Sequence, residues 1–209
     1  MARSLLGPLR GARVADVGGR PGQAARVFRG ADVVAINVDE PADVVFDGVS
    51  LPFPDASFDA ALSMDVLEHV EPAQRDRHVA ELVRVSSGPV LVSAPLGTPE
   101  HRAIEEELQA WFAVHSGAPH PFLADHLRLG LPDVAEVERL ARAFGLAAHF
   151  HGDAREAAET LQRTALLRRR PWLAVPLALR LARRFPDLRL SVAPGPFTNR
   201  VFLVSMLAG

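Results

Sequence analysis

Short apolar runs alternate with polar stretches of helical spacing along the first half of the chain. The apolar runs predict strands at 13–17, 33–38, 42–46, 58–63 and 89–95, and a closing strand at 200–205. The intervening patterns predict helices at 23–28 and 71–84, and further on at 104–115 and 133–144, with Asp133 as a possible N-cap. Apolar strands that alternate with helices are typical of a parallel sheet covered on both faces. The pattern therefore predicts an α/β fold.

The segment 161–190 differs from the rest of the chain. Arginines alternate with apolar residues at helical spacing, which predicts a basic, amphipathic helical insertion before the last strand. One interpretation is a peripheral contact with a membrane surface. The other is a lid or core-covering helix pair, which we favour because Pro171 and Pro176 interrupt any long interfacial helix. Residues 116–122 and 125–132 are expected to be loops.

Composition limits the possible partners. A chain of 209 residues with 48% hydrophobic content is long enough for one core, and no linker is apparent, so we expect a single domain over 1–209. A formal net charge of -2 gives no reason to expect nucleic-acid binding. The sequence contains neither cysteine nor lysine, which excludes thiolate and lysine catalysis. We find neither a signal peptide nor a membrane-spanning segment and expect a cytoplasmic protein whose substrate is a small molecule or a glycan.

A glycine-rich turn follows the first expected strand. The strand at 13–17 runs into Gly18, Gly19, Arg20, Pro21 and Gly22, after which a helix is expected. Strand, glycine turn and helix form the opening of a nucleotide-binding βαβ unit, in which backbone N–H groups approach an anionic group.

Two further motifs follow the turn along the chain, and their order and spacing are informative. They are the loop LPFPDASFD at 51–59 and the stretch DVLEHV at 65–70. Together with the glycine turn, they make the region 13–95 resemble the small class I S-adenosylmethionine-dependent methyltransferases with a type-11-like domain. The resemblance implies a Rossmann-like, doubly wound, mostly parallel seven-stranded sheet with helices on both faces, and S-adenosylmethionine as cofactor. The resemblance implies cofactor-binding roles for Asp16, Gly18, Gly19, Arg20, Gly22, Asn37, Asp39, Asp47, Gly48 and Asp65.

Two positions depart from the family pattern. Arg20 stands where the central glycine of the turn is expected, so it either obstructs the pocket or pairs with the cofactor carboxylate. Asn37 stands where an acid normally binds the ribose, and Asp39 is a possible substitute. These departures leave open a degenerate fold that serves as a binding or scaffolding module. A dinucleotide-dependent oxidoreductase is disfavoured because the turn is not GxGxxG and the chain has no tyrosine.

Histidines supply the candidates for acceptor chemistry. His69 is the best general base by position, and His101 is a second catalytic candidate. His115, His120 and His126 are candidates for substrate binding, whereas His78 is expected to be a surface residue. The density of histidines indicates a substrate pocket or, less favoured, a divalent metal site of histidines and carboxylates. Their spacing matches no metal-ligand motif, so no metal site is predicted.

Overall fold

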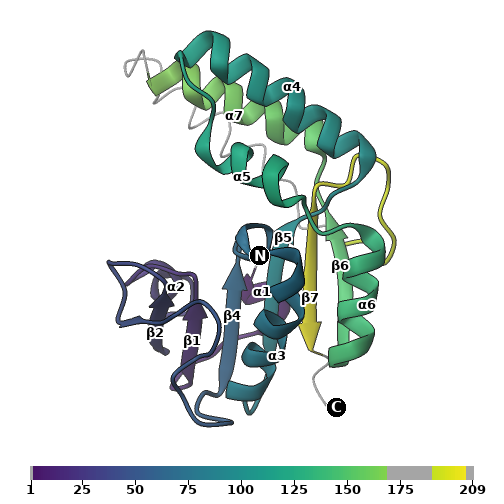
Figure 1. Ribbon diagram of the computed structural model, residues 1–209. Helices are drawn as coiled ribbons and strands as arrows, with labels where there is room; N and C mark the ends of the chain where they lie inside the picture. Colours follow the sequence, from purple (N-terminus) through teal and green to yellow (C-terminus); the bar gives the residue numbers. More distant parts are fainter. Residues whose placement is uncertain (1, 169–189, 206–209) are drawn as a thin grey trace.

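A seven-stranded sheet with helices on both sides forms the body of the molecule in the computed structural model, which describes residues 2–168 and 190–205 (Figure 1). The strands are β1 (Arg13–Val17), β2 (Asp32–Asn37), β3 (Val44–Val45), β4 (Ala60–Met64), β5 (Val90–Pro95), β6 (Leu146–His151) and β7 (Arg200–Ser205). The α-helices are α1 (Ala2–Leu6), α2 (Gln23–Val27), α3 (Arg75–Val85), α4 (Pro99–Ser116), α5 (Pro121–Leu129), α6 (Val134–Phe144) and α7 (Ala154–Arg168), and two 3-10 helices are η1 (Leu67–His69) and η2 (Pro72–Gln74).

The strand order is β3-β2-β1-β4-β5-β7-β6. Every neighbouring pair is parallel except the two that involve β7, which runs antiparallel to β5 and β6. The order reverses direction between β1 and β4, and in such sheets ligands bind outside the carboxyl ends of the strands at that point. The predicted α/β fold with a mostly parallel sheet is confirmed.

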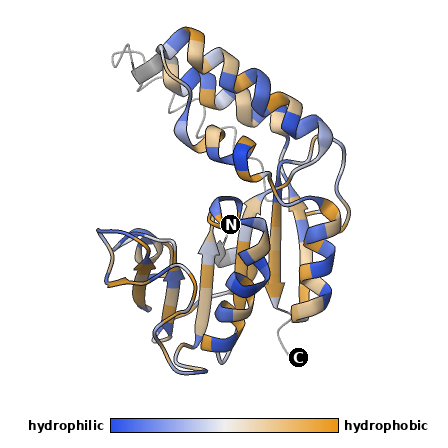
Figure 2. Cartoon of the chain, in the orientation of Figure 1, coloured by the Kyte–Doolittle hydropathy of each residue, from blue (hydrophilic) through white to orange (hydrophobic). Residues whose placement is uncertain are grey.

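Each face of the sheet is buried by its own helices. Side chains of β1 alternate in direction, so that Ala15 and Val17 join the cluster that α3 and α6 cover, and Val14 joins the opposite cluster with Leu6 of α1. Phe28, which follows α2, is 3% exposed and seals the second cluster. Figure 2 shows the resulting hydrophobic strands between helices of mixed polarity.

Three helices lie over the carboxyl ends of the parallel strands as a cap, which consists of α4, α5 and α7 (Figure 1). Leu108 and Phe112 of α4 and Leu123 of α5 form a small core of their own, against which Leu161 of α7 packs. The Thr98 side chain accepts a hydrogen bond from the His101 backbone N–H at 3.1 Å and so fixes the start of α4. The cap therefore stands at the sheet edge where a ligand is expected.

Several boundaries differ from the sequence-based prediction. The expected loop at 125–132 is wrong, because α5 extends from Pro121 to Leu129, and Pro121 occupies the first helical turn, where proline is favourable. The helix expected at 104–115 starts earlier, at Pro99, and β6 was not predicted at all. Asp133 is confirmed as the N-cap of α6, since its carboxylate accepts the Glu136 N–H at 2.8 Å.

The predicted basic insertion at 161–190 is only partly visible. Its first residues continue α7 to Arg168, and 169–189 lie outside the described residues. Within the described ranges, no helix has the length and hydropathy needed to cross a bilayer.

Candidate functional site

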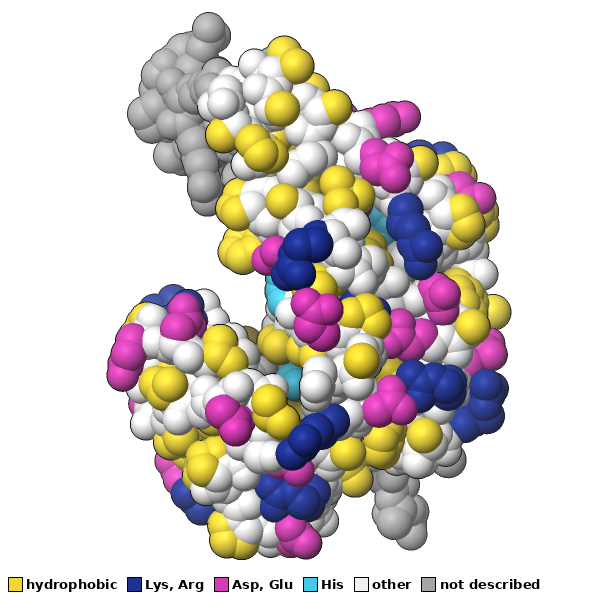
Figure 3. All heavy atoms as spheres, in the orientation of Figure 1, with side chains coloured by type: hydrophobic (Ala, Val, Ile, Leu, Met, Phe, Trp, Pro, Cys, Tyr) yellow, Lys and Arg dark blue, Asp and Glu magenta, His cyan; other side chains and the backbone are white. Residues whose placement is uncertain are grey.

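Two adjoining cavities open where the cap meets the sheet. The turn cavity, of about 530 Å³, is bounded by the glycine turn and the ends of β2 and β3. The cap cavity, of about 500 Å³, lies between α4, α5 and α7 and the ends of β5 and β7. Asp65, His69 and Phe122 line both cavities. Figure 3 shows the hollow between the two parts of the molecule, with histidine side chains on its wall.

Glycine is required at two positions of the turn. Gly18 has a φ of +85°, and a Cβ there would lie 2.1 Å from Cγ2 of Val66. At Gly19, a Cβ would lie 2.0 Å from Oδ2 of Asp16. Asp16 is 5% exposed, and burial raises the pKa of its carboxyl to about 6. The turn thus packs directly on a buried carboxyl below it and on Val66 beside it.

Asn37 holds the turn from the end of β2. Its Nδ2 donates to the carbonyl oxygens of Gly18 at 3.1 Å and Gly19 at 3.2 Å, while its Oδ1 accepts the Val38 N–H at 2.8 Å. Both ends of the amide are therefore engaged with backbone groups, which an acid at this position would not satisfy.

Arg20 lines the turn cavity without filling it. Its guanidinium lies 3.2 Å from Oδ1 of Asp39, and it also donates to the Pro41 carbonyl at 3.5 Å. Because a cavity of about 530 Å³ remains with Arg20 in its wall, the side chain does not obstruct the site.

The far wall of the turn cavity is apolar. Val38, which is 58% exposed, and Phe46 line it together with Gly48. Asp47 does not line the cavity, because its Oδ1 accepts the backbone N–H groups of Val49 at 2.8 Å and Ser50 at 2.9 Å. These hydrogen bonds, that of Ser50 first, lower the pKa of the Asp47 carboxyl.

The segment from Asp65 to Val70 separates the two cavities. Asp65 follows β4 with a φ of +58°, donates its N–H to Ser93 O at 2.9 Å and pairs through its carboxylate with Arg200 of β7. A non-glycine residue in the left-handed region is uncommon, and such residues gather at functional sites. This turn directs the chain into η1, which carries Glu68 and His69.

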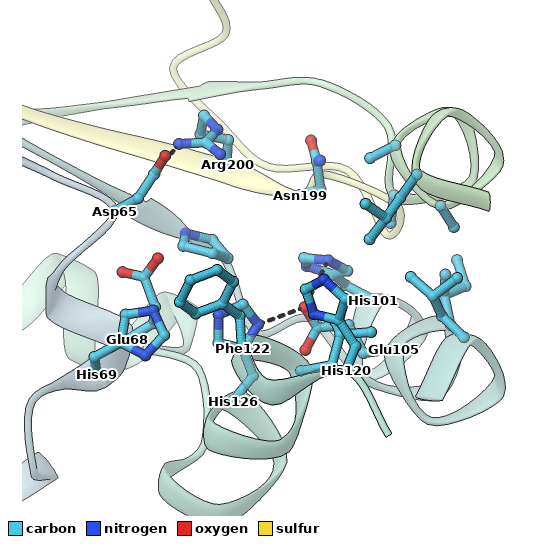
Figure 4. A pocket seen from close by; sticks show the side chains of 18 residues that line it. Asp65, Glu68, His69, His101, Glu105, His120, Phe122, His126, Asn199 and Arg200 are labelled. Carbon is cyan, nitrogen blue, oxygen red and sulfur yellow. Dashed lines mark hydrogen bonds and ion pairs between the residues drawn. The ribbon is translucent and has the colours of Figure 1, made fainter. Parts of the chain in front are cut away.

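Carboxylates orient two histidines beside Glu68 (Figure 4). His69 Nδ1 lies 3.5 Å from Oδ2 of Asp125, and His126 Nδ1 lies 2.8 Å from Oε1 of Glu105. Burial lowers the pKa of His69, and the neighbouring His126 contributes to this shift. For His126, burial opposes protonation, but the hydrogen bond to Glu105 and its charge outweigh it and raise the pKa.

Glu68 is the most deeply buried member of this group. Its side chain is 2% exposed, and its Oε2 has no hydrogen-bond partner within the part of the chain that the structure describes. Burial raises the pKa of its carboxyl to about 7. A buried acceptor without a partner is costly and rare, so this oxygen requires an explanation.

The predicted cofactor residues divide into two groups. The residues that line the turn cavity are Gly18, Arg20, Asn37, Gly48 and Asp65. The predicted cofactor residues that do not line the turn cavity are Asp16, Gly19, Gly22, Asp39 and Asp47.

Of the predicted catalytic and substrate residues, all but one line the cap cavity. Those lining it are His69, His101, His120 and His126. His115 is exposed on α4, where its ring stacks on Trp111 at a centroid distance of 4.4 Å, and it does not line this cavity.

The expectation that His78 is a surface residue is wrong. His78 is 9% exposed, and its Nε2 lies 2.8 Å from the Ser63 hydroxyl of β4. It lies on the buried face of α3, which the helical period of 71–84 allowed but did not single out.

Sequence reasoning missed several lining residues. Phe122, Asn199 and Arg200 reach the site from α5 and from the approach to β7. Nothing in their local sequence marks them, because only the fold brings them to the sheet edge. Glu68 had a signal, since it adjoins His69 in the 65–70 motif.

The chain matches known proteins in sequence over one region and in fold over its length. Residues 15–88, about a third of the chain, match the family model described as a methyltransferase domain. No curated protein matches the chain. Residues 15–88 are thus similar in sequence to a methyltransferase domain.

Solved structures share the fold at low sequence identity. Phosphoethanolamine N-methyltransferase 2 of Haemonchus contortus, in complex with S-adenosyl-L-methionine, is 18% identical with a TM-score of 0.54, over 99% of this chain and 51% of that one. An S-adenosylmethionine-dependent methyltransferase of Mesorhizobium loti is 18% identical with a TM-score of 0.53, over 97% and 94%. The [4+2]-cyclase SpnF is 19% identical with a TM-score of 0.52, over 97% and 76%. The chain spans about half the length of the Haemonchus protein, and its similarity to these structures is one of fold.

Proposed function

From the similarity of residues 15–88 to a methyltransferase domain, we propose that this protein transfers a methyl group from S-adenosylmethionine to a small-molecule or glycan acceptor. The observation that carries the proposal is the pair of cavities that meet at Asp65, His69 and Phe122. A transfer between two bound molecules needs two adjoining sites at the sheet edge where ligands bind.

The turn cavity fits the methyl donor. Its volume of about 530 Å³ lies within the range of cofactor sites, about 300–1,000 Å³. Val38 and Phe46 provide an apolar wall for the adenine ring, and the glycine turn leads into α2. Asp65 and Glu71 are the acidic residues of the lining, and each also pairs with an arginine, Asp65 with Arg200 and Glu71 with Arg128.

When bound, the donor supplies an activated methyl group. The residues of this chain contribute mainly positioning, which in well-oriented cases is worth about 7–11 kcal/mol. Asp65 lies at the boundary beyond which the acceptor is placed in this proposal, and Phe122 of α5 lines both cavities.

The cap cavity suits an acceptor with a polar end and an apolar body. Histidines and carboxylates face the boundary with the turn cavity, whereas Leu108, Leu123 and Leu161 line the part under α4, α5 and α7. His69 is the general base in this proposal, because it borders both cavities and its lowered pKa keeps the ring neutral and able to take a proton from a hydroxyl. His101 is a second candidate within the cap cavity.

Calorimetric titration with S-adenosylmethionine and S-adenosylhomocysteine, with NAD as a control ligand, tests the donor site. We expect 1:1 binding of the first two and none of NAD. Two exposed valines provide a matched pair of variants, since Val38 lines the turn cavity and Val114 lies on α4 outside it. Val38→Ala removes two methyl groups, each worth about 0.8 kcal/mol, so donor binding should weaken by roughly tenfold. Val114→Ala should leave it unchanged.

No binding of either sulfur compound by folded protein would overturn the proposal and favour a binding or scaffolding module of the same fold. Equal effects of the two valine variants would remove the turn cavity from the donor role.

A further inference from the structure

Three potential metal ligands converge at the wall between the two cavities. Glu68, His69 and His126 each offer one ligand atom, and these atoms lie within 4.8 Å of one another. Two of the ligands come from η1 and the third from α5, so the docking of α5 on η1 assembles the group (Figure 4). All three residues line the cap cavity.

The burial of Glu68 is an independent indication of a ligand. Its carboxylate is 2% exposed, and Oε2 lacks a hydrogen-bond partner among the described residues. A well-packed core would place an apolar side chain at such a position, because an unsatisfied buried carboxylate costs several kcal/mol. A cation bound by Glu68 would remove this cost.

Further carboxylates orient both histidines as metal ligands are usually oriented. Glu105 holds Nδ1 of His126 at 2.8 Å, and Asp125 lies 3.5 Å from Nδ1 of His69. A carboxylate on one ring nitrogen fixes the tautomer and leaves Nε2 with its lone pair for the metal. Glu105 is itself 5% exposed and lies 3.7 Å from Nε2 of His101, so its position is fixed as well.

We propose that Glu68, His69 and His126 bind a divalent first-row transition-metal ion, such as Zn²⁺, that faces the cap cavity. Two imidazoles and one carboxylate suit this class of ion, whereas Mg²⁺ prefers oxygen ligands alone. Three protein ligands leave at least one coordination position open, as in catalytic rather than structural sites. That position is directed to the cap cavity, where an oxygen of the acceptor would occupy it.

This inference deepens the proposed function and rests on it for the identity of the cavity's occupant. In the metal-bound protein, His69 would be a ligand and would no longer act as the general base; the ion would instead orient the acceptor oxygen and favour its deprotonated form. Of the three ligands, His69 lines the turn cavity as well, whereas Glu68 and His126 do not, so changes at these two residues separate zinc binding from donor binding.

Calorimetry on protein freed of metal by chelator tests the site, with ZnCl₂ as the probe and MgCl₂ as the control. We expect saturable 1:1 zinc binding by the full chain and no competition from millimolar Mg²⁺. Substitution with Co²⁺ should give visible absorption bands typical of four- or five-coordinate nitrogen and oxygen ligation.

Glu68→Gln keeps the shape of the side chain and removes the charge, and His126→Gln removes a nitrogen ligand. Each change should weaken zinc binding at least 100-fold. Changes to the groups that only orient metal ligands already weaken metal binding by about 10–100-fold, so the loss of a ligand should cost at least as much. His115→Gln, which removes an exposed histidine outside the cavity, should have no effect.

Absence of saturable zinc binding in the wild type, or equal binding by Glu68→Gln, would overturn the metal site. Titration of the same variants with S-adenosylmethionine separates the two proposals. Lost zinc binding with donor binding retained in Glu68→Gln supports both, and a wild type that binds zinc but not the donor overturns only the methyl-transfer proposal.

Discussion

Asn37→Asp restores the acid that the resemblance leads one to expect, and the structure predicts that it destabilises the protein. Asn37 Nδ2 donates to Gly18 O at 3.1 Å and to Gly19 O at 3.2 Å. An aspartate places an oxygen against both carbonyl oxygens. The loss of two hydrogen bonds, at about 0.5–1.5 kcal/mol each, lowers the free energy of unfolding by about 1–3 kcal/mol. Repulsion between the oxygens adds to this loss.

The loss should depend on pH. The two carbonyl oxygens disfavour the charged carboxylate, so the pKa of the introduced carboxyl rises in the folded state, while the protonated form can donate one hydrogen bond. A raised carboxyl pKa means that the folded protein binds the proton more tightly, so stability falls as pH rises from the unfolded pKa near 4 to the raised value. The variant should therefore lose more stability near pH 8 than near pH 5.

Urea unfolding followed by circular dichroism measures both effects. Asn37→Ala is the control, because it removes the same two hydrogen bonds without adding a charge, and its loss should be the same at both pH values. An Asp variant as stable as the wild type near pH 8 would refute the role of Asn37 in holding the turn. If that variant also bound S-adenosylmethionine more tightly, Asn37 would be assigned to the ribose instead.

Three further changes test the elements around the site. Burial lowers the pKa of His78 from 6.5 to about 4, so its contribution to stability is fully present above pH 6.5 and is lost as pH drops towards 4. In urea unfolding, His78→Gln should therefore reduce the loss of stability between pH 6.5 and pH 4 by about 3 kcal/mol. An unchanged pH dependence in this variant would contradict the shift. Arg75→Met removes a guanidinium that is 2% exposed and pairs with Glu136 at 2.9 Å, so it should lower the free energy of unfolding, measured by thermal unfolding, by about 3–5 kcal/mol. Arg139→Met is the control, because it breaks an exposed ion pair and should lower that free energy by under about 1 kcal/mol. Gly18→Ala should weaken donor binding below the detection limit of calorimetry, because the added Cβ would lie 2.1 Å from Cγ2 of Val66. Donor binding at the wild-type affinity would show that the turn can shift.

The sequence predicted the strands that carry strong apolar runs. It did not predict elements whose formation depends on contacts between distant parts of the chain. The first strand was predicted at 13–17, where β1 lies, because Val14, Ala15 and Val17 form a short apolar run that leads into the glycine turn. β6 was missed because Leu146–His151 contains no β-branched residue, and its burial depends on pairing with β7, which lies at least 49 residues further along the chain. Pro121 and Gly130 were interpreted as loop signals, although they mark the first turn and the end of α5.

The same distinction between local and long-range signals applies to the residues of the candidate site. The glycine turn and Asn37 were recognised because the turn, its strand and its helix are contiguous in the sequence. The pairing of Glu68 with His126 was not, because these residues are far apart in the sequence and meet only when α5 docks on η1. Histidine spacing argued against a metal site, but spacing reports only on ligands that share one local element.

The segment from Asp65 to Val70 connects every part of the proposed chemistry. Its Val66 closes on Gly18 of the donor turn, and its Glu68 and His69 face the acceptor. Arg75 fixes the end of the segment by donating to Val70 O at 3.1 Å and to Gly130 O beyond α5. A change at Arg75 should therefore weaken donor and zinc binding together, whereas changes at Val38 or Glu68 weaken only one. If Arg75→Met, measured at a temperature where it remains folded, leaves both affinities at wild-type values, the two cavities do not depend on a common support.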